Sequence, residues 1–282
     1  MIARVEIQRI AASLGVDPQV IDHDYALGCF LHELVRQPEV EKSWLFKGGT
    51  SLAKCHFHGY RFSEDLDFTV VSPLTAQRFV EILDLVRHAV QDHIGLRMDM
   101  RESLVDVVAD DYGKESFEGK ISYQGVWMFR GDPRTIRVHI TQDELVAFSP
   151  IRTSIIHPYS DASEFLRVTL QTYALEEVFV EKLRALSGQR RYAIARDLFD
   201  LHFLSDKEVD IEAAVRTFRR KCEAKGLIPE NIDIASIRAK RDDFKLNWEN
   251  NLEYLLPDHL KCPFEDAWEN SVSLLERAKA SL

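Results

Sequence analysis

The chain has 282 residues, 45% of them hydrophobic and 29% charged, and carries a formal net charge of −10 at pH 7. Its length allows one large domain or two ordinary ones, and its composition is that of a soluble globular protein with a sizeable core. The acidic balance argues against a broadly basic nucleic-acid coat, although a local basic channel remains compatible with it.

The sequence predicts no membrane span, no signal peptide and no paired cysteines. No stretch approaches about 18 uncharged apolar residues, so no membrane span is expected, and the first nine residues lack the apolar segment of a signal peptide. The four cysteines are scattered without a CxxC pair or a neighbouring histidine cluster: Cys29, Cys55, Cys222 and Cys262. Free thiols in a reducing cytoplasm are therefore expected.

Apolar periodicity and turn residues predict the elements of the first part of the chain in order. Helices are expected up to about Gly15 and over 21–35, 50–57 and 75–93, and short strands over 43–47 and 61–71. Pro38 is expected to end the second helix. Thr50 or Ser51 is expected to cap the third helix, because a hydroxyl at that position accepts a hydrogen bond from a free backbone N–H.

A small sheet is expected to continue beyond these elements. Strands are predicted over 96–100, 119–129 and 135–140, with turn residues at 131–134 that make the last two a hairpin. Residues 44–141 would then form a small, mostly antiparallel sheet with helices packed on it. After a connector at 158–163 the chain is predicted to be helical, over 175–186, 193–204, 211–225, 234–256 and 263–282.

The first candidate site combines a glycine turn with two aspartates. Gly48 and Gly49 allow backbone N–H groups to approach a ligand closely, and the N-terminus of the helix that follows favours phosphate. Asp65 and Asp67 lie at i and i+2 of a strand, so their carboxylates share one face about 6.5 Å apart. Mg²⁺ is the usual cation between two such carboxylates. An enzyme acting on a nucleoside triphosphate is indicated; the structural alternative is that Asp65 caps a turn and Asp67 faces solvent.

A second constellation lies in the helical part of the chain. Lys182, Arg190, Arg191 and Arg196 form a basic stretch, and Asp197 and Asp200 share a helix face at i, i+3. Lys182 and Asp200 lie on different helices if Ser187–Gly188 breaks the run. The alternative interpretation is a pair of amphipathic helices with ordinary surface ion pairs.

Taken together, the two motifs resemble the AbiEii/AbiGii-type toxin family, the nucleotidyltransferase-like proteins that include the MenT toxins. Its first pattern is matched by Phe46–Leu52 and Arg61–Asp67, and its helical pattern by Glu176–Leu186 and Arg190–Asp200. Weaker similarity extends over most of the chain. The resemblance implies an α+β fold, with a polymerase-β-like nucleotidyltransferase core of a small mixed sheet and packed helices at 1–160 and a helical domain at 161–282.

The resemblance also assigns expected roles to individual residues. Asp65 and Asp67 would bind Mg²⁺, Lys182 would neutralise phosphate charge, and Asp200, with Asp197 beside it, would be a further required acid. The expected nucleotide-binding residues are Lys47, Gly48, Gly49, Thr50, Ser51, Arg61, Arg190, Arg191 and Arg196. The catalytic groups would face a cleft between the two parts of the chain.

One position departs from the pattern. Polymerase-β-like enzymes usually carry a third carboxylate on a later strand, where this chain has His139. Strand histidines are more often hydrogen-bonded structural residues than ligands or bases. Three readings stay open: Asp143 or Glu144 supplies the carboxylate from the strand end, His139 acts as a base, or the site holds metal less tightly.

The function implied by the resemblance is that of a cytoplasmic toxin. It would transfer a nucleoside monophosphate from an NTP, with Mg²⁺, to the 3′ end of tRNA or another RNA, and release pyrophosphate. A cognate antitoxin encoded nearby and abortion of phage infection are expected, with no membrane partner. Two alternatives remain: modification of a small molecule or a protein hydroxyl, and a non-catalytic module that binds NTP or antitoxin.

Overall fold

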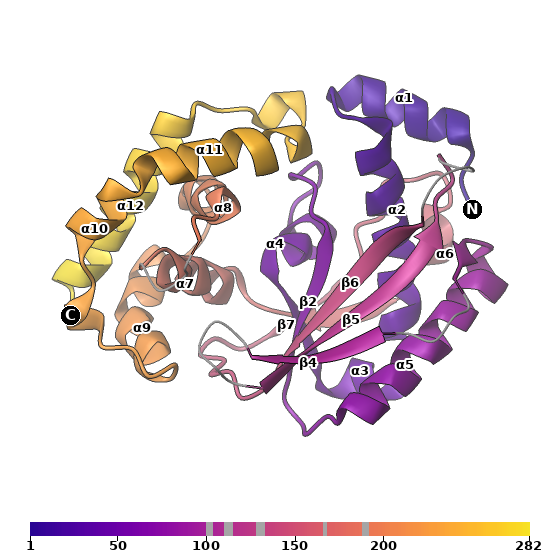
Figure 1. The fold of residues 1–282 in the computed structure, drawn as a ribbon, viewed down its shortest axis with the longest axis horizontal. Helices are drawn as coiled ribbons and strands as arrows, with labels where there is room; N and C mark the ends of the chain where they lie inside the picture. Colours follow the sequence, from indigo (N-terminus) through magenta and orange to yellow (C-terminus); the bar gives the residue numbers. More distant parts are fainter. Residues whose placement is uncertain (100–103, 110–114, 128–132, 166–167, 188–191) are drawn as a thin grey trace. The chain divides into compact units, whose positions relative to one another are not determined.

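The computed structural model describes residues 1–99, 104–109, 115–127, 133–165, 168–187 and 192–282. The chain forms two compact units, each built from separate segments (Figure 1). Unit 1 comprises Met1–Asp143, Pro150–Thr172 and Leu255–Leu260. Unit 2 comprises Glu144–Ser149, Tyr173–Tyr254 and Lys261–Leu282. The chain therefore passes from one unit to the other several times.

Unit 1 holds the sheet and the helices of the first part of the chain. Its strands are β1 (Trp44–Lys47), β2 (Asp65–Val70), β3 (Arg97–Met98), β4 (Leu104–Ala109), β5 (Glu115–Gln124), β6 (Arg134–Thr141), β7 (Ile151–Ser154) and β8 (Thr169–Thr172). Its helices are α1 (Arg4–Leu14), α2 (Pro18–Val35), α3 (Pro38–Ser43), α4 (Gly48–Ser51), α5 (Ala76–Ala89) and α6 (Ala162–Phe165). Two π-helical turns, Leu52–His56 and Val90–Ile94, extend α4 and α5.

The sheet of unit 1 is mixed. Within the described residues it has eight strands in the order β3-β5-β6-β2-β1-β8-β7, and β4 also pairs with β5. The β2–β6 and β1–β8 pairs are parallel, and the other pairs are antiparallel. The expected α+β class with a small mixed sheet and packed helices is confirmed, and so is the β5–β6 hairpin pairing.

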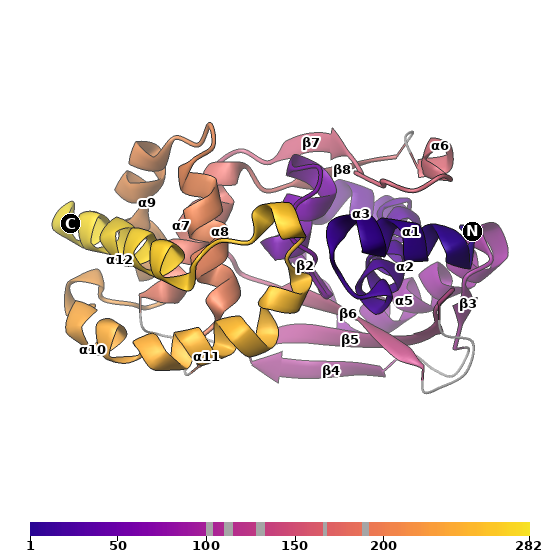
Figure 2. The ribbon, with the colours of Figure 1, turned by 90° about the horizontal axis from the view of Figure 1, so that it is seen from above.

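The core of unit 1 lies on one face of this sheet. Leu66 and Phe68 of β2 and Val138 and Ile140 of β6 point into it and are at most 1% exposed. Helices α2 and α5 pack over this face, as Figure 2 shows. Because strand residues alternate between faces, Asp65, Asp67, Arg137 and His139 necessarily point away from the helices. The core thus fixes which face of the sheet carries the charged residues.

Helix α2 is buried along almost its whole length, including several charged positions. Several of its buried polar atoms have partners: Asp22 Oδ1 accepts hydrogen bonds from the backbone N–H groups of Val126 and Trp127 at 2.8 and 3.1 Å. Lys54 Nζ donates to Asp24 Oδ2 at 2.6 Å, and the Tyr159 hydroxyl donates to the same oxygen at 2.7 Å. These bonds offset the cost of removing the groups from water.

Unit 2 is helical. Its helices are α7 (Leu175–Leu186), α8 (Ala195–Ser205), α9 (Ile211–Glu223), α10 (Ile234–Ala239), α11 (Arg241–Asn251) and α12 (Phe264–Ala280). Buried aromatic residues form its core, with Phe199, Trp248 and Trp268 at most 2% exposed. Among the described residues, no helix is both long enough and apolar enough to cross a membrane. All four cysteines are free thiols, as expected.

Several sequence predictions about element boundaries are wrong. The second helix ends at Val35, before Pro38, as expected, but Pro38 also opens a short helix that was not predicted, because proline suits the first turn of a helix. Strands β4, β7 and β8 were not predicted, and the connector at 158–163 contains the start of α6. The long helix expected over 234–256 divides at Lys240 and ends at Asn251. The expected strand end at 128–129 and most of the turn at 131–134 lie outside the described residues.

Candidate functional site

The glycine turn follows β1 directly and forms the start of α4. Gly48 has φ 76°, a left-handed conformation that side chains disfavour. A Cβ atom at Gly48 would lie 2.5 Å from Asp67 Oδ2, and one at Gly49 would overlap the guanidinium of Arg61. The missing side chains therefore bring the backbone of the turn directly against a carboxylate and a guanidinium.

Gly48→Ala is expected to destabilise the protein more than Gly95→Ala. Both glycines have positive φ, but a Cβ at Gly95 would meet no atom within 4 Å. Alanine at Gly95 should cost about 1–2 kcal/mol of unfolding free energy for backbone strain. Alanine at Gly48 should cost roughly 1–3 kcal/mol more, because it also displaces Asp67. Equal losses in urea unfolding experiments would contradict the close approach of the turn to Asp67.

The two hydroxyls after the glycines hold the turn in place from inside. The Thr50 hydroxyl donates a hydrogen bond to the carbonyl of Asp65, and the Ser51 hydroxyl donates to the carbonyl of Gly48 at 2.8 Å. Both side chains are buried. The expectation that one of them caps the helix is wrong: the helix begins at Gly48, and Lys47 is its N-cap. Thr50 instead joins the turn to the first residue of β2.

Arg61 lies under the turn and is 1% exposed. Its Nη1 donates to the carbonyl of Phe62 at 3.1 Å, and the guanidinium lies 5.6 Å from the centre of the Tyr60 ring. An arginine guanidinium keeps its positive charge in proteins even when it is buried. Arg61 therefore places a fixed charge beneath Gly49.

Beside the turn, a row of charged residues crosses five strands in register. Lys47 of β1 pairs with Asp67 of β2, Asp67 with His139 of β6, His139 with Glu118 of β5, and Glu118 with Asp106 of β4. Directly paired residues on neighbouring strands point to the same face. The row thus runs Lys47–Asp67–His139–Glu118–Asp106 on the face opposite the helices; we call it the charged row.

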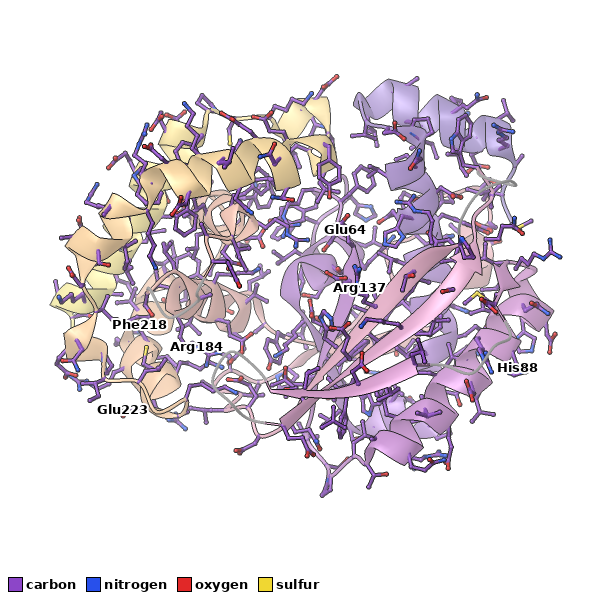
Figure 3. All side chains as sticks on the ribbon, in the orientation of Figure 1. Glu64, His88, Arg137, Arg184, Phe218 and Glu223 are labelled. Carbon is purple, nitrogen blue, oxygen red and sulfur yellow. The ribbon has the colours of Figure 1, made fainter. Side chains whose placement is uncertain are left out.

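A shorter row runs next to it. Asp65 pairs with Arg137, which is labelled in Figure 3, and Arg137 pairs with Lys120. Arg137 Nη1 lies 3.7 Å from Asp65 Oδ1. Lys120 Nζ lies 2.8 Å from Glu118 and 3.0 Å from Asp106. The hydrogen bond from Lys120, opposed in part by burial, lowers the pKa of Glu118 below its usual value.

His139 lies between two carboxylates of the charged row. Its Nδ1 is 3.2 Å from Asp67 Oδ1, and its Nε2 is 3.4 Å from Glu118 Oε2. Burial alone would lower the pKa of His139, but the hydrogen bond to Asp67 and the charges of Asp67, Asp65 and Glu118 outweigh it and raise the pKa to about 9. The imidazole is therefore a cation at neutral pH.

We expect NMR titration of the His139 ring to give an apparent pKa near 9. A pKa raised above the unfolded value of about 6.5 means that the stabilisation is fully present below pH 6.5 and is lost as pH rises through 9. The side chain is 36% exposed, and because solvent screens its ion pairs, the stabilisation should amount to only about 1 kcal/mol. A titration midpoint at or below 6.5 would contradict this arrangement.

Asp65 and Asp67 place carboxylate oxygens beside the turn. Among the described residues, no group of three or more His, Cys, Asp or Glu side chains is arranged to hold a metal ion. His139 stands where the third carboxylate of a two-metal site is expected. Mg²⁺ is commonly bound by one or two carboxylates together with substrate phosphates and water, so the pair fits that ion when a nucleotide completes its shell.

In unit 2, Lys182 lies between two buried aspartates. Its Nζ is 2.6 Å from Asp197 Oδ1 and 3.0 Å from Asp200 Oδ2, and Asp200 is 0% exposed. Lys182 lies on α7 and both acids lie on α8, as expected if the helix breaks after Ser187. The interpretation of these contacts as surface ion pairs is wrong. Arg196 lies on the first turn of α8, and Arg190 and Arg191 lie outside the described residues.

Glu144 belongs to a second buried group of charges in unit 2. Its carboxylate contacts Arg184 (Figure 3), Lys221 and Lys225, each at 3.0 Å. Together with Glu177 and Glu181 these residues form what we call the ion cluster. Glu144 is only 2% exposed there, and both of its oxygens are engaged. Asp143, just before it, has φ 54°.

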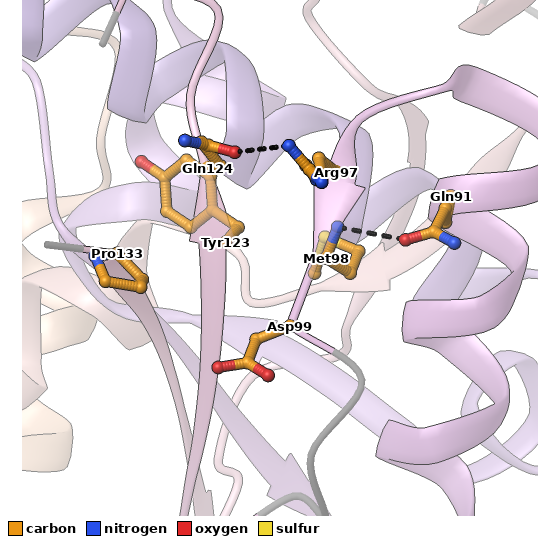
Figure 4. Close-up of a pocket in the computed structure, with 7 residues that line it drawn as sticks. All are labelled: Gln91, Arg97, Met98, Asp99, Tyr123, Gln124 and Pro133. Carbon is orange, nitrogen blue, oxygen red and sulfur yellow. Dashed lines mark hydrogen bonds between the residues drawn. The ribbon is translucent and has the colours of Figure 1, made fainter. Parts of the chain in front are cut away.

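A cavity in unit 1 lies away from the charged row. It has a volume of about 420 Å³ and is lined by Gln91, Arg97, Met98, Asp99, Tyr123, Gln124 and Pro133 (Figure 4). Arg97 donates to Gln124 Oε1 at 3.1 Å within it. Tyr123 lies five residues along β5 from Glu118, which corresponds to about 17 Å of strand. The cavity contains none of the residues predicted to bind nucleotide or metal.

The sequence matches the family described as "Nucleotidyl transferase AbiEii toxin, Type IV TA system" over residues 30–270. The chain therefore belongs to the AbiEii family and is a nucleotidyltransferase toxin of a type IV toxin–antitoxin system, as the resemblance implied. No curated protein sequence matches it.

Solved structures with a similar fold include proteins from two bacteria. MenT4, a nucleotidyltransferase toxin from Mycobacterium tuberculosis, is 18% identical, with a TM-score of 0.55 over 99% of both chains. JHP933 from Helicobacter pylori is 17% identical, with a TM-score of 0.53 over 94% of both chains. At these identities the likeness concerns the fold alone, and it confirms the expected nucleotidyltransferase core.

Proposed function

We propose that this toxin transfers a nucleoside monophosphate from an NTP to an acceptor hydroxyl, most directly the 3′ end of a tRNA, with Mg²⁺. The observation that carries the proposal is the contact of Gly48 with Asp67: a turn suited to phosphate lies directly beside a carboxylate suited to a metal. A nucleotidyltransferase needs these two functions within one site, because the metal bridges protein and triphosphate.

The triphosphate would be held by the backbone of the glycine turn. Gly48 and Gly49 open α4, and the first N–H groups of a helix have no partner within it. Such groups favour phosphate oxygens. The hydroxyls of Thr50 and Ser51 donate hydrogen bonds to backbone carbonyls. These two residues would therefore contribute to phosphate binding by shaping the turn. Lys47 and Arg61 add positive charge at its start and beneath it.

Asp65 and Asp67 would hold Mg²⁺ with the help of phosphate oxygens. When bound, the ion neutralises triphosphate charge and favours displacement at the α-phosphorus. Asp67 Oδ2 faces the turn, so a cation there would lie next to the phosphates. Glu144 is held in the ion cluster, and we assign the third position to His139, which pairs directly with Asp67. Its imidazolium supplies positive charge on the sheet face where other nucleotidyltransferases place a carboxylate.

Lys182 and Asp200 are proposed as further residues required for transfer. The two aspartates hold the Lys182 ammonium in position through short ion pairs. A fixed cation can stabilise the negative charge that develops on pyrophosphate as it leaves. Three arginines lie close to Lys182 and Asp200 in the sequence, and we propose that they bind phosphate or RNA: Arg190, Arg191 and Arg196. The family implies a cognate antitoxin, which we propose is encoded beside the toxin.

The acceptor class is tested by following the label from α-³²P NTPs. Purified protein is incubated with Mg²⁺ and, in separate reactions, total tRNA, a protein extract or a small-molecule fraction. Label in RNA that is lost after removal of the tRNA 3′-terminal nucleotides supports the proposal. Label in protein or small molecules would assign the second function instead, which the net charge of −10 favours. NTP binding without pyrophosphate release would indicate a non-catalytic module.

A further inference from the structure

Glu118 contacts the candidate site only through another residue. It lies on β5, directly opposite His139 of β6, and its Oε2 is 3.4 Å from His139 Nε2. The other ring nitrogen of His139 is 3.2 Å from Asp67 Oδ1. Nδ1 thus makes a hydrogen bond with Asp67, whereas Nε2 makes no hydrogen bond and lies at ion-pair distance from Glu118. The three side chains form a continuous chain across three adjacent strands.

The chain of contacts fixes the orientation of the Asp67 carboxylate. Its Oδ1 is engaged by His139, whereas its Oδ2 lies against the glycine turn, 2.5 Å from the position of a Gly48 Cβ. A carboxylate that rotates about χ2 would exchange these two oxygens or turn both away. The imidazole, hydrogen-bonded to Asp67 and attracted at its other nitrogen to the Glu118 carboxylate, restricts that rotation, because following the carboxylate would move it away from Glu118.

Glu118 is itself fixed from the other side. Lys120 Nζ lies 2.8 Å from Glu118 Oε1 and also 3.0 Å from Asp106. One Glu118 oxygen is thus held by Lys120 and the other faces His139. Asp106 resembles Glu118 in charge, in its contact with Lys120 and in its position on the same face, but it lies one strand further away. It provides a matched control for the effect of charge alone.

We propose that Glu118 is a positioning residue that, through His139, holds Asp67 with Oδ2 directed at the glycine turn and so sets the affinity of the site for a divalent cation. The inference rests on the proposed function, in which Asp67 binds that cation. Partners that orient metal ligands in this way commonly contribute a factor of about 10–100 to metal affinity.

The test is Mn²⁺ binding to the full-length protein, measured by electron paramagnetic resonance with a saturating non-hydrolysable NTP analogue and without acceptor. Glu118→Ala should weaken the affinity about tenfold, and Asp106→Ala by less than about twofold. His139→Asn keeps an N–H donor near the Nδ1 position but cannot reach Glu118. In that background, Glu118→Ala should have almost no further effect, because its route to Asp67 is already cut.

The outcomes separate failure of the positioning role from failure of the proposed metal site. Asp67→Asn should abolish Mn²⁺ binding; unchanged binding in that variant would overturn both. If Asp67→Asn behaves as expected but Glu118→Ala matches Asp106→Ala or the wild type, the metal site stands and the positioning role is overturned. A full effect of Glu118→Ala in the His139→Asn background would also overturn it. Should Glu118→Ala fail to fold, Glu118→Gln should still weaken binding at least threefold.

Discussion

Replacing Asp67 by Asn should lower the rate of nucleotidyl transfer by about a thousandfold or more. The amide keeps the size of the side chain and can still contact His139 or the glycine turn, but it removes the charge that would hold a divalent cation. Loss of metal-assisted charge neutralisation at the transition state is worth several kcal/mol, and about 4 kcal/mol corresponds to a factor of a thousand. Initial rates with a radiolabelled NTP measure the effect.

Asp106→Asn is the control for that substitution. The substitution removes the same charge from the same face of the sheet, but Asp106 lies on β4, two strands beyond β6. The Asp106 carboxylate is 3.0 Å from Lys120 Nζ. Its rate should stay within about threefold of the wild type, because charges this exposed are screened. Comparable rates for Asp67→Asn and wild type, with intact folding by circular dichroism, would remove Asp67 from the reaction.

Replacing Lys221 by Met should destabilise the protein by about 3–5 kcal/mol. Lys221 is fully buried in the ion cluster, with its Nζ 2.6 Å from Glu177, 3.0 Å from Glu144 and 3.2 Å from Glu181. It also donates to the carbonyl of Leu145 at 2.6 Å. Methionine fits the space but leaves buried carboxylates with less opposing charge. The free energy of unfolding in urea measures the loss.

The ion cluster also predicts how stability depends on pH. Burial alone would lower the pKa of Lys221, but the charges of Glu181, Glu144 and Glu177 outweigh it and raise the pKa above its usual value. The stabilisation is thus fully present below the unfolded pKa of about 10.4 and is lost only as pH rises through the higher folded value. Wild-type protein should resist unfolding at pH 10 better than the variant.

Lys245→Met is the matched control, because Lys245 is exposed on α11 of the same unit. It should change the unfolding free energy by less than about 0.5 kcal/mol. A loss below about 1 kcal/mol for Lys221→Met would mean that the ion cluster contributes little, and that the segment Glu144–Ser149 is held by other contacts. Among those contacts are the hydrogen bonds that Glu177 accepts from Ala147 and Phe148 at 2.8 Å.

Local spacing in the sequence predicted the centre of the candidate site. Asp65 and Asp67 are two residues apart on one strand and therefore point to the same face of the sheet. In the structure both lie on β2 in this arrangement. The glycines were expected to permit a close approach, and the approach is to Asp67 and Arg61. The helix Leu175–Leu186 was predicted with the bounds that it has, because its apolar period and its break at Ser187 are both local signals.

Features that depend on strand register could not be predicted in this way. Thr50 was expected to cap a helix, but its hydroxyl finds the carbonyl of Asp65, fifteen residues away. Glu118 gave no signal, because its partner His139 becomes its neighbour only through the β5–β6 register. Glu144 fitted a metal-ligand role by its position after β6, and only the packing of α7 and α9 shows its cationic neighbours.

Nucleotidyl transfer is tested most directly by comparing NTPs that carry the label at two different phosphates. The protein is incubated with Mg²⁺, total tRNA and an NTP labelled with ³²P at either the α- or the γ-phosphate. Transfer of a nucleoside monophosphate predicts that the RNA gains label from the α-labelled NTP and none from the γ-labelled NTP, whose label leaves as pyrophosphate. Label that reaches the RNA from the γ-phosphate, or from neither position in any acceptor fraction, would contradict the claim.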